Sequence, residues 1–209
     1  MMTTLFLASD STCQSYEEKD APQAGWGQFL QEYLPAYQIS NHAIGGRSSR
    51  TFIEEGRLSV IEKTMKEGDF LLIQMGHNDS TKDKPERYTE PYRDYKQYLK
   101  QYIHTARKNH AAPVLITPVA RLHYVSGEFL ADFGDYCNAM KEVGEEEQCP
   151  VIDLMQHSIN HLKNAGFEEA KTYYMVDVNG TDHTHFTEKG ASQIAKILAN
   201  HISSLMKSY

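Results

Sequence analysis

The stretch TLFLASDST, residues 4–12, decides the fold, because an unbroken apolar run ends there in a cluster of polar side chains. A strand with one buried face alternates apolar and polar residues, whereas a strand buried on both faces is apolar throughout. Residues 4–8 therefore predict a central strand of a parallel sheet. Ligands of such sheets bind beyond the carboxyl ends of the strands, so we expect residues 9–12 to lie at a functional edge.

The rest of the chain alternates apolar runs with amphipathic helical segments. Further runs that predict strands occupy residues 37–44, 70–73, 114–116 and 151–152. Apolar residues at three- and four-residue steps form helical stripes, one at Tyr92, Tyr95, Leu99, Tyr102, Ile103 and Ala106 and another at Ala191, Ile194, Ala195, Leu198, Ile202 and Leu205. Thr187 is placed to cap the final helix. The alternation predicts an α/β fold, a three-layer α/β/α sandwich around a five-stranded parallel sheet.

Length and composition limit the classes of function. A chain of 209 residues, 40% hydrophobic and 23% charged, predicts one globular domain over residues 1–209. Twenty-one Lys and Arg against 28 Asp and Glu give a net charge of −7, which argues against nucleic acid or an anionic membrane as a partner. No apolar run approaches the ~20 residues that a membrane helix needs.

The cysteines and the first residues predict a cytoplasmic protein. Cys13, Cys137 and Cys149 make an odd number with no CxxC pair, so neither a disulfide framework nor a zinc knuckle is predicted. Reduced thiols fit the cytosol. The first residues show no basic segment followed by a long apolar run, so no export signal is expected. The sequence leaves the oligomeric state open.

Four polar clusters fall where strands end or where the last helix begins. They occupy residues 9–12, 41–48, 76–79 and 182–185. Acyl transfer needs a serine, a base that takes its proton, an acceptor that holds the base in one tautomer, and donors for the oxyanion. Asp182 and His185 are three residues apart, a spacing that lets the carboxylate reach one imidazole nitrogen while the other faces a serine elsewhere.

The residues of these four blocks resemble the motifs of a known family. In this order they read Ser9-Asp10-Ser11-Thr12, Asn41 followed by Gly46-Arg47-Ser48, Gly76-His77-Asn78-Asp79, and Asp182-His183-Thr184-His185. The sequence resembles the SGNH, or GDSL-type, hydrolases, and most closely the rhamnogalacturonan acetylesterase family. The resemblance implies a flavodoxin-like fold and a serine esterase without metal or cofactor.

The resemblance also implies residue roles. It makes Ser11 the nucleophile, His185 the base and Asp182 the group that orients the base. The oxyanion donors would be the N–H of Ser11, the N–H of Gly46 and the side chain of Asn78. Substrate contacts are expected from Arg47, His77 and His183. Ser9 stands where the family has glycine, and we expect the turn to form nevertheless.

The expected substrate is an acetylated oligosaccharide derived from pectin, namely rhamnogalacturonan. Because that polymer carries galacturonate, a protein of net charge −7 is not steered toward it by its overall charge. Local cations in or after the four blocks can offset this: Arg47, Arg50, Lys82, Lys84, Arg87, Arg121 and Lys189.

Other interpretations of these residues stay open. Ser11 is also typical of a residue that caps a helix, and Cys13 is a second candidate nucleophile. A metallohydrolase site would comprise His77, Asp79, Asp182, His183 and His185, although no HExxH spacing is present. A flavin-binding module of the flavodoxin type is a further alternative, although the sequence contains no GxGxxG segment. Within the esterase interpretation, other small acyl esters are the alternative substrates.

Overall fold

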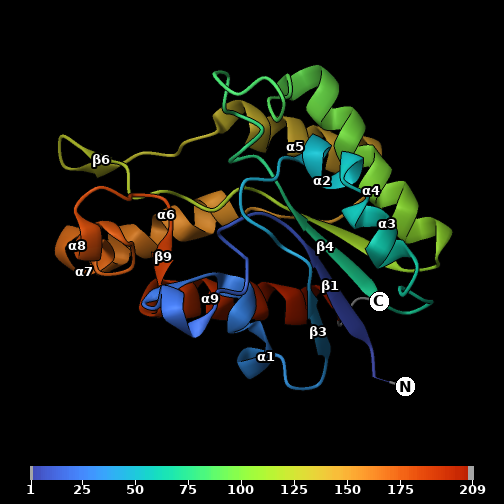
Figure 1. Cartoon of the computed structure of the whole chain (residues 1–209), viewed down its shortest axis with the longest axis horizontal. Coiled ribbons are helices and arrows are strands. Elements are labelled where there is room, and N and C mark those ends of the chain that lie inside the picture. The colour runs from blue at the N-terminus through green and yellow to red at the C-terminus, as the bar shows by residue number, and fades with distance from the viewer. Residues whose placement is uncertain (1, 207–209) are drawn as a thin grey trace.

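The computed structural model describes residues 2–206, so the two ends of the predicted 1–209 domain, Met1 and residues 207–209, lie outside the described residues. A parallel sheet in the order β3-β1-β4-β5-β8 runs through the centre (Figure 1). Its strands are β1 (Thr4–Ala8), β3 (Gln38–Asn41), β4 (Phe70–Gln74), β5 (Ala112–Ile116) and β8 (Val151–Ile152). The first of these strands lies between the second and the third, which is the flavodoxin-like order. The predicted five-stranded parallel sheet is confirmed.

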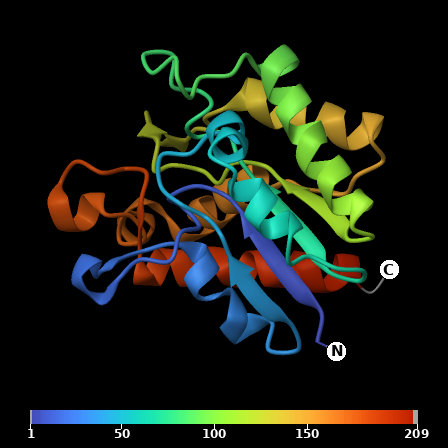
Figure 2. The same ribbon diagram turned by 45° about the vertical axis from the view of Figure 1, so that its right-hand side comes forward.

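Helices cover both faces of the sheet, because the apolar side chains of each central strand point alternately to the two sides. In β1, Leu5 and Leu7 belong to one core cluster, and Phe6 and Ala8 belong to the other. The first cluster is closed by α1 (Leu30–Tyr33), α6 (Leu154–Ala165) and α9 (Glu188–Met206). The second is closed by α2 (Ser49–Glu54), α3 (Arg57–Glu62), α4 (Lys96–Lys108) and α5 (Gly134–Glu146). Figures 1 and 2 show these layers on opposite sides of the sheet.

Short elements occupy the connections. They are the 3₁₀ turns η1 (Glu18–Asp20) and η2 (Trp26–Gln28), the π-helical turn η3 (Pro91–Tyr95), the helices α7 (Phe167–Lys171) and α8 (Val176–Asn179), and the strands β2 (Gln23–Ala24), β6 (Tyr124–Val125), β7 (Glu128–Phe129) and β9 (Phe186–Thr187). Strands β6 and β7 form a hairpin at the left of Figure 1. Strand β2 pairs antiparallel with β9, which brings the segment before α9 beside the loop that follows β1.

The predicted helical stripes are buried except for Tyr92 and for Leu205, which is partly buried. Tyr95, Leu99 and Tyr102 are fully buried, whereas Tyr92 is 45% exposed. The cause is local: the N–H of Tyr95 donates to the carbonyl of Glu90, five residues earlier, so the chain makes a π turn there and Tyr92 leaves the stripe.

The final helix begins as predicted. The N–H of Gly190 donates to Oγ1 of Thr187 at 3.3 Å, so Thr187 caps α9. Among residues 2–206, no helix combines the length and the apolar character needed to cross a bilayer.

Gly190 fixes how closely α9 approaches the chain before β9. A β-carbon built on Gly190 would lie 2.0 Å from the carbonyl oxygen of Tyr173, which is backbone and cannot rotate away. We expect Gly190→Ala to lower the free energy of unfolding by about 1–3 kcal/mol in urea denaturation, the usual cost of overpacking.

The matched control is Gly134→Ala at the start of α5, where an added β-carbon meets no atom within 4 Å. That variant should keep the stability of the wild type or gain slightly, because alanine favours helices over glycine. Equal effects of the two substitutions would contradict this interpretation of the packing.

Candidate active site

The turn after β1 is built around the buried carboxylate of Asp10. Its Oδ1 accepts hydrogen bonds from the N–H of Thr12 at 2.9 Å and from Oγ1 of Thr12 at 2.8 Å. The backbone carbonyl of Asp10 accepts hydrogen bonds from the N–H groups of Cys13 and Gln14. Among the described residues no helix follows this turn, so Ser11 caps nothing, and its half-buried side chain is free for another role.

The side chain of Ser11 meets the imidazole of His185 across a separation of 174 residues. The Oγ of Ser11 lies 2.9 Å from Nε2 of His185. The Nδ1 of His185 lies 2.7 Å from Oδ2 of Asp182. The structure therefore places hydroxyl, imidazole and carboxylate in one connected line, in the order that the sequence predicts.

The turn at residues 182–185 holds this line in place. Oδ1 of Asp182 accepts from the N–H groups of Thr184 at 2.9 Å and of His185 at 3.0 Å. Burial by itself would raise the pKa of Asp182, but these hydrogen bonds and the side chain of His185 outweigh it and lower the pKa below 3.8. A carboxylate that stays ionised accepts a hydrogen bond from Nδ1–H of His185, which leaves Nε2 free to accept from Ser11.

The segment around Gly46 lies against Ser11, and Asn78 contacts that segment through Arg47. A β-carbon built on Gly45 would be 3.5 Å from Cβ of Ser11. Gly46 has φ of +80°, a conformation that glycine adopts without strain. Within residues 2–206, the N–H groups of Ser11 and Gly46 donate to no protein acceptor. One hydrogen of Nδ2 of Asn78 is taken by the carbonyl of Arg47 at 3.0 Å. Unused N–H groups beside a serine are the type of donor that stabilises an oxyanion.

Comparison with known proteins identifies the family. The family model described as GDSL-like lipase/acylhydrolase matches residues 6–198.

The chain belongs to this family.

It is accordingly a carboxylic ester hydrolase. It is 53% identical over 206 residues to the Bacillus subtilis protein named probable rhamnogalacturonan acetylesterase YesY, covering 98% of this chain and 94% of that one. It is 40% identical over 212 residues to rhamnogalacturonan acetylesterase RhgT of the same organism, covering 96% and 90%. The crystal structure of the Bacillus subtilis protein YXIM matches with a TM-score of 0.87 at 27% identity, over 98% of this chain and 57% of that one. The predicted family and fold are confirmed.

A second buried carboxylate, Asp79, anchors the segments that carry Gly46 and Asn78. It accepts from the N–H of Ser49, at 3.1 and 3.0 Å to its two oxygens, and from Oγ1 of Thr89 at 2.8 Å. Burial raises the pKa of Asp79 to about 6, against the opposing effect of these donors. Because Ser49 begins α2, Asp79 ties the segment that follows Gly46 to the segment that carries Asn78.

His77 and Arg47 have partners inside the protein, which departs from the expectation that they contact substrate. The His77 ring is 5% exposed; its Nδ1 lies 3.1 Å from Oδ2 of Asp10, and its Nε2 lies 3.0 Å from the carbonyl of Val119. Both nitrogens are thus engaged, and we assign the ring to holding the Asp10 turn. Arg47 pairs with Glu55 at 3.0 Å and donates to the carbonyl of Gly45.

His183 is the expected contact whose side chain reaches solvent. It is exposed and lines a cavity of about 400 Å³ together with Arg121, His123 and Asp132. Its carbonyl accepts from the N–H of Leu122 at 2.9 Å. His183 therefore lies next to the reacting groups, on a surface open to a ligand.

The alternative chemistries find less support in the geometry. Cys13 is fully buried, and burial raises the pKa of its thiol well above the ordinary value, so the thiolate is not available. Among residues 2–206, no three His, Cys, Asp or Glu side chains are arranged to hold a metal ion. His77 pairs with Asp10 and Asp79 with Ser49, so these two residues do not join the cluster at His185.

Several residues of the site carry no signal in the sequence pattern. Oε1 of Gln14 accepts from the N–H of Gly45, and the hydroxyl of Tyr16 donates to the carbonyl of Ser11 at 3.0 Å. Burial raises the pKa of Tyr16 to about 12, so it stays a donor. Ser9 is fully buried without a positive φ, so the turn forms without the family glycine. Only the fold brings these contacts together.

The Asp10 contacts predict a pH dependence of stability. Burial by itself would raise the pKa of Asp10, but His77 and the donors of Thr12 outweigh it and lower the pKa below 3.8. The unfolded carboxyl takes up its proton first as the pH falls, so the stability that the folded carboxylate contributes is fully present well above the ordinary pKa of 3.8 and is lost progressively as the pH falls through that value toward the lower folded pKa. Asp10→Asn should therefore show a shallower loss of unfolding free energy between pH 5 and pH 3, measured by urea denaturation at each pH.

The matched control is Asp83→Asn on the exposed loop, which should keep the slope of the wild type. A wild-type slope in Asp10→Asn would show that the Asp10 contacts do not favour its ionised form.

Proposed function

We propose that this hydrolase is a serine esterase that removes O-acetyl groups from rhamnogalacturonan oligosaccharides derived from pectin. The observation that carries the proposal is the line of hydrogen bonds from Ser11 through His185 to Asp182, beside the unused N–H groups of Ser11 and Gly46. The names of the relatives at 53% and 40% identity support the substrate class.

The first half of the reaction transfers the acetyl group to the enzyme. Nε2 of His185 takes the hydroxyl proton of Ser11 as Oγ attacks the acetyl carbonyl carbon. The oxyanion that forms is bound by the N–H groups of Ser11 and Gly46 and by the remaining Nδ2 hydrogen of Asn78. The imidazolium, stabilised by Asp182, then protonates the sugar oxygen as the ester bond breaks.

The second half releases acetate. Water gives a proton to Nε2 of His185 and attacks the acetyl carbon on Ser11. The same donors bind the second oxyanion. When the intermediate collapses, His185 returns the proton to Oγ of Ser11 and acetate leaves. Each proton transfer to or from the protein runs along the line of groups that the 2.7 Å and 2.9 Å contacts already join.

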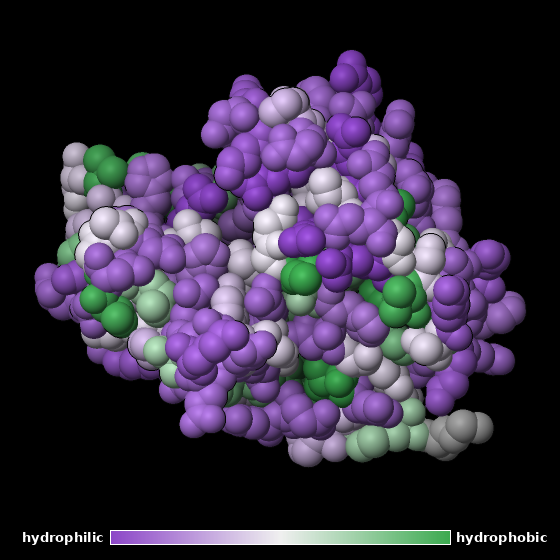
Figure 3. Space-filling model, viewed as in Figure 1, coloured by the Kyte–Doolittle hydropathy of each residue, from purple (hydrophilic) through white to green (hydrophobic). Residues whose placement is uncertain are grey.

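The surface favours a sugar over a lipid. The face shown in Figure 3 is mostly hydrophilic, with hydrophobic residues in small separate patches. Such a face offers no broad apolar area for a lipid surface. Cytoplasmic action on imported oligosaccharides stays a prediction; Cys13, Cys137 and Cys149 are free and buried, as reduced thiols would be.

Replacement of the nucleophile is the direct test. Ser11→Ala should lower kcat for acetate release from acetylated rhamnogalacturonan and from 4-nitrophenyl acetate by more than about 10⁴-fold, because no acyl-enzyme can form. Circular dichroism should show an intact fold. Ser59→Ala, on the exposed face of α3, is the matched control and should keep full activity. Full turnover by a folded Ser11→Ala protein, or loss of wild-type activity in EDTA, would argue for different chemistry.

Asn78 tests the oxyanion site separately. Asn78→Ala should lower kcat by about 10²–10³-fold with little change in KM, because its amide acts on charge that develops only in the transition state. Steady-state kinetics on 4-nitrophenyl acetate measure both constants. A rise in KM at constant kcat would instead assign Asn78 to binding the substrate in its ground state.

A further inference from the structure

The arginines divide into two groups by their partners. The chain has seven, all among residues 2–206. Five lie within 4.0 Å of a carboxylate: Arg47 and Arg57 with Glu55, Arg50 with Glu54, Arg93 with Asp94, and Arg107 with Glu147. Within residues 2–206, Arg87 and Arg121 have no carboxylate partner, although the net charge is −7. Both lie beside the Ser11–His185 pair.

Arg87 lies against the turn that we propose binds the oxyanion. Its Nη1 is 3.4 Å from the carbonyl of Gly46, and a β-carbon built on Gly46 would lie 3.5 Å from the same nitrogen. Its Nε is buried and has no acceptor among residues 2–206. A buried donor without an acceptor costs free energy, so the described protein does not satisfy this guanidinium fully.

Arg121 lies beside the segment that carries His185. The adjacent residue, Leu122, donates its N–H to the carbonyl of His183 at 2.9 Å, which joins this loop to the turn at residues 182–185. The guanidinium of Arg121 covers the ring of Phe133 at 4.7 Å from the centroid, and its Nε is also buried without an acceptor in the described part of the chain.

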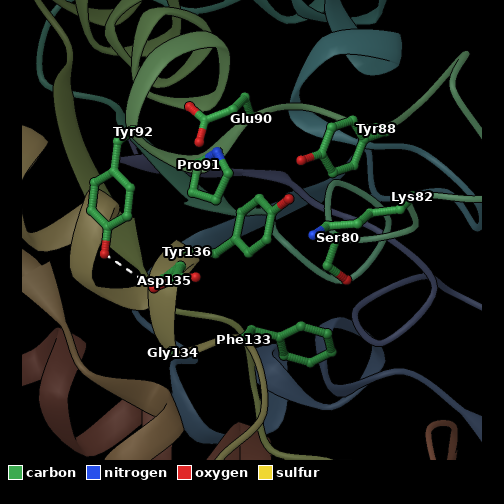
Figure 4. A pocket seen from close by; sticks show the side chains of 10 residues that line it. All are labelled: Ser80, Lys82, Tyr88, Glu90, Pro91, Tyr92, Phe133, Gly134, Asp135 and Tyr136. Atoms are coloured by element: carbon green, nitrogen blue, oxygen red, sulfur yellow. Dashed lines mark hydrogen bonds between the residues drawn. The ribbon is translucent and has the colours of Figure 1, made fainter.

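The other charges nearby do not neutralise Arg121. Asp132 lines the same cavity, but its Oδ1 lies 2.9 Å from Nδ1 of His123, and within 4.0 Å it makes no ion pair with the arginine. Phe133 also lines the next hollow, where Figure 4 shows it together with Ser80 and Lys82. Lys82 is exposed there, and Glu90 and Asp135 line the same hollow.

Three cations that the sequence offered for an acidic substrate are committed elsewhere. Arg47 pairs with Glu55, Arg50 with Glu54 and Lys189 with Glu169. Of the remaining candidates, Arg87 contacts the Gly46 turn, and Arg121 lines the same cavity as His183.

We infer that Arg87 and Arg121 bind carboxylates of an acidic sugar chain, Arg87 on the oxyanion side of Ser11 and Arg121 on the histidine side. The inference rests on the proposed esterase function and names the two residues that recognise the uronate carboxylates of its substrate. A guanidinium presents two N–H groups in the geometry of a carboxylate. Two guanidinium groups also create a local positive potential, although the net charge of the protein is negative.

The test compares one oligosaccharide in two charge states. Acetylated rhamnogalacturonan fragments are assayed with free uronate carboxylates and again after these are converted to neutral methyl esters, with acetate release as the readout. Wild type should show a kcat/KM about tenfold or more higher on the acidic form, and this preference should shrink at 0.5 M NaCl.

The variants Arg87→Gln, Arg121→Gln and their combination are measured by the ratio of kcat/KM on the two forms. Effects on the chemical step, including any through Gly46, act on both substrates and cancel in that ratio. Each single variant should lower the ratio and the double variant should bring it near one. Arg93→Gln, an exposed arginine paired with Asp94, is the matched control and should keep the wild-type ratio.

Each result decides one question. Equal rates on the two forms in wild type, or a ratio that survives the double variant, overturns the carboxylate sites and leaves the proposed function intact. Hydrolysis of 4-nitrophenyl acetate with no acetate released from either oligosaccharide overturns the proposed function and this inference with it.

Discussion

The hydrogen bond between Oγ of Ser11 and Nε2 of His185 is the contact on which the rest of the site depends. It joins a turn after the first strand to a turn before the last helix, and the pairing of β2 with β9 brings those segments together. Asp182 then fixes the imidazole from the other side. Without the contact between Ser11 and His185, the N–H groups of Ser11 and Gly46 that we propose as donors would have no oxyanion to stabilise.

Buried carboxylates give the site its rigidity. Asp10 holds the nucleophile turn through Thr12 and reaches through His77 to the carbonyl of Val119, beyond β5. Asp79 holds the start of α2 through Ser49. Asp10 accepts from its own turn and contacts the ring of His77, and Asp79 accepts from Ser49 and Thr89, which offsets part of the cost of burying each charge. The donors that we propose for the oxyanion thus lie on segments that these carboxylates tie together, which is the arrangement that electrostatic preorganisation requires.

The sequence predicted what depends on local pattern, and missed what depends on distant contacts. Residues 4–8 are apolar on both faces, and that pattern was enough to predict the central strand. Asp182 and His185 interact within one turn, so their spacing carried the information. His77 was expected at substrate because its motif says nothing of Asp10 and Val119, which hold it inside. Tyr92 left its stripe because a π turn changed the helical phase. The sequence also could not show that Arg87 and Arg121 have no carboxylate partner within residues 2–206, because this depends on where the fold places the Asp and Glu side chains.

The central claim is that Ser11 is the reacting nucleophile, and the most direct measurement is the site of covalent attachment of a serine-directed phosphonate. The wild-type protein is inactivated, digested and analysed by mass spectrometry. The account predicts one adduct per chain, on the peptide that contains Ser11, formed in step with the loss of acetate release. Complete inactivation with the adduct on another residue, or full activity after Ser11 is modified, would contradict it.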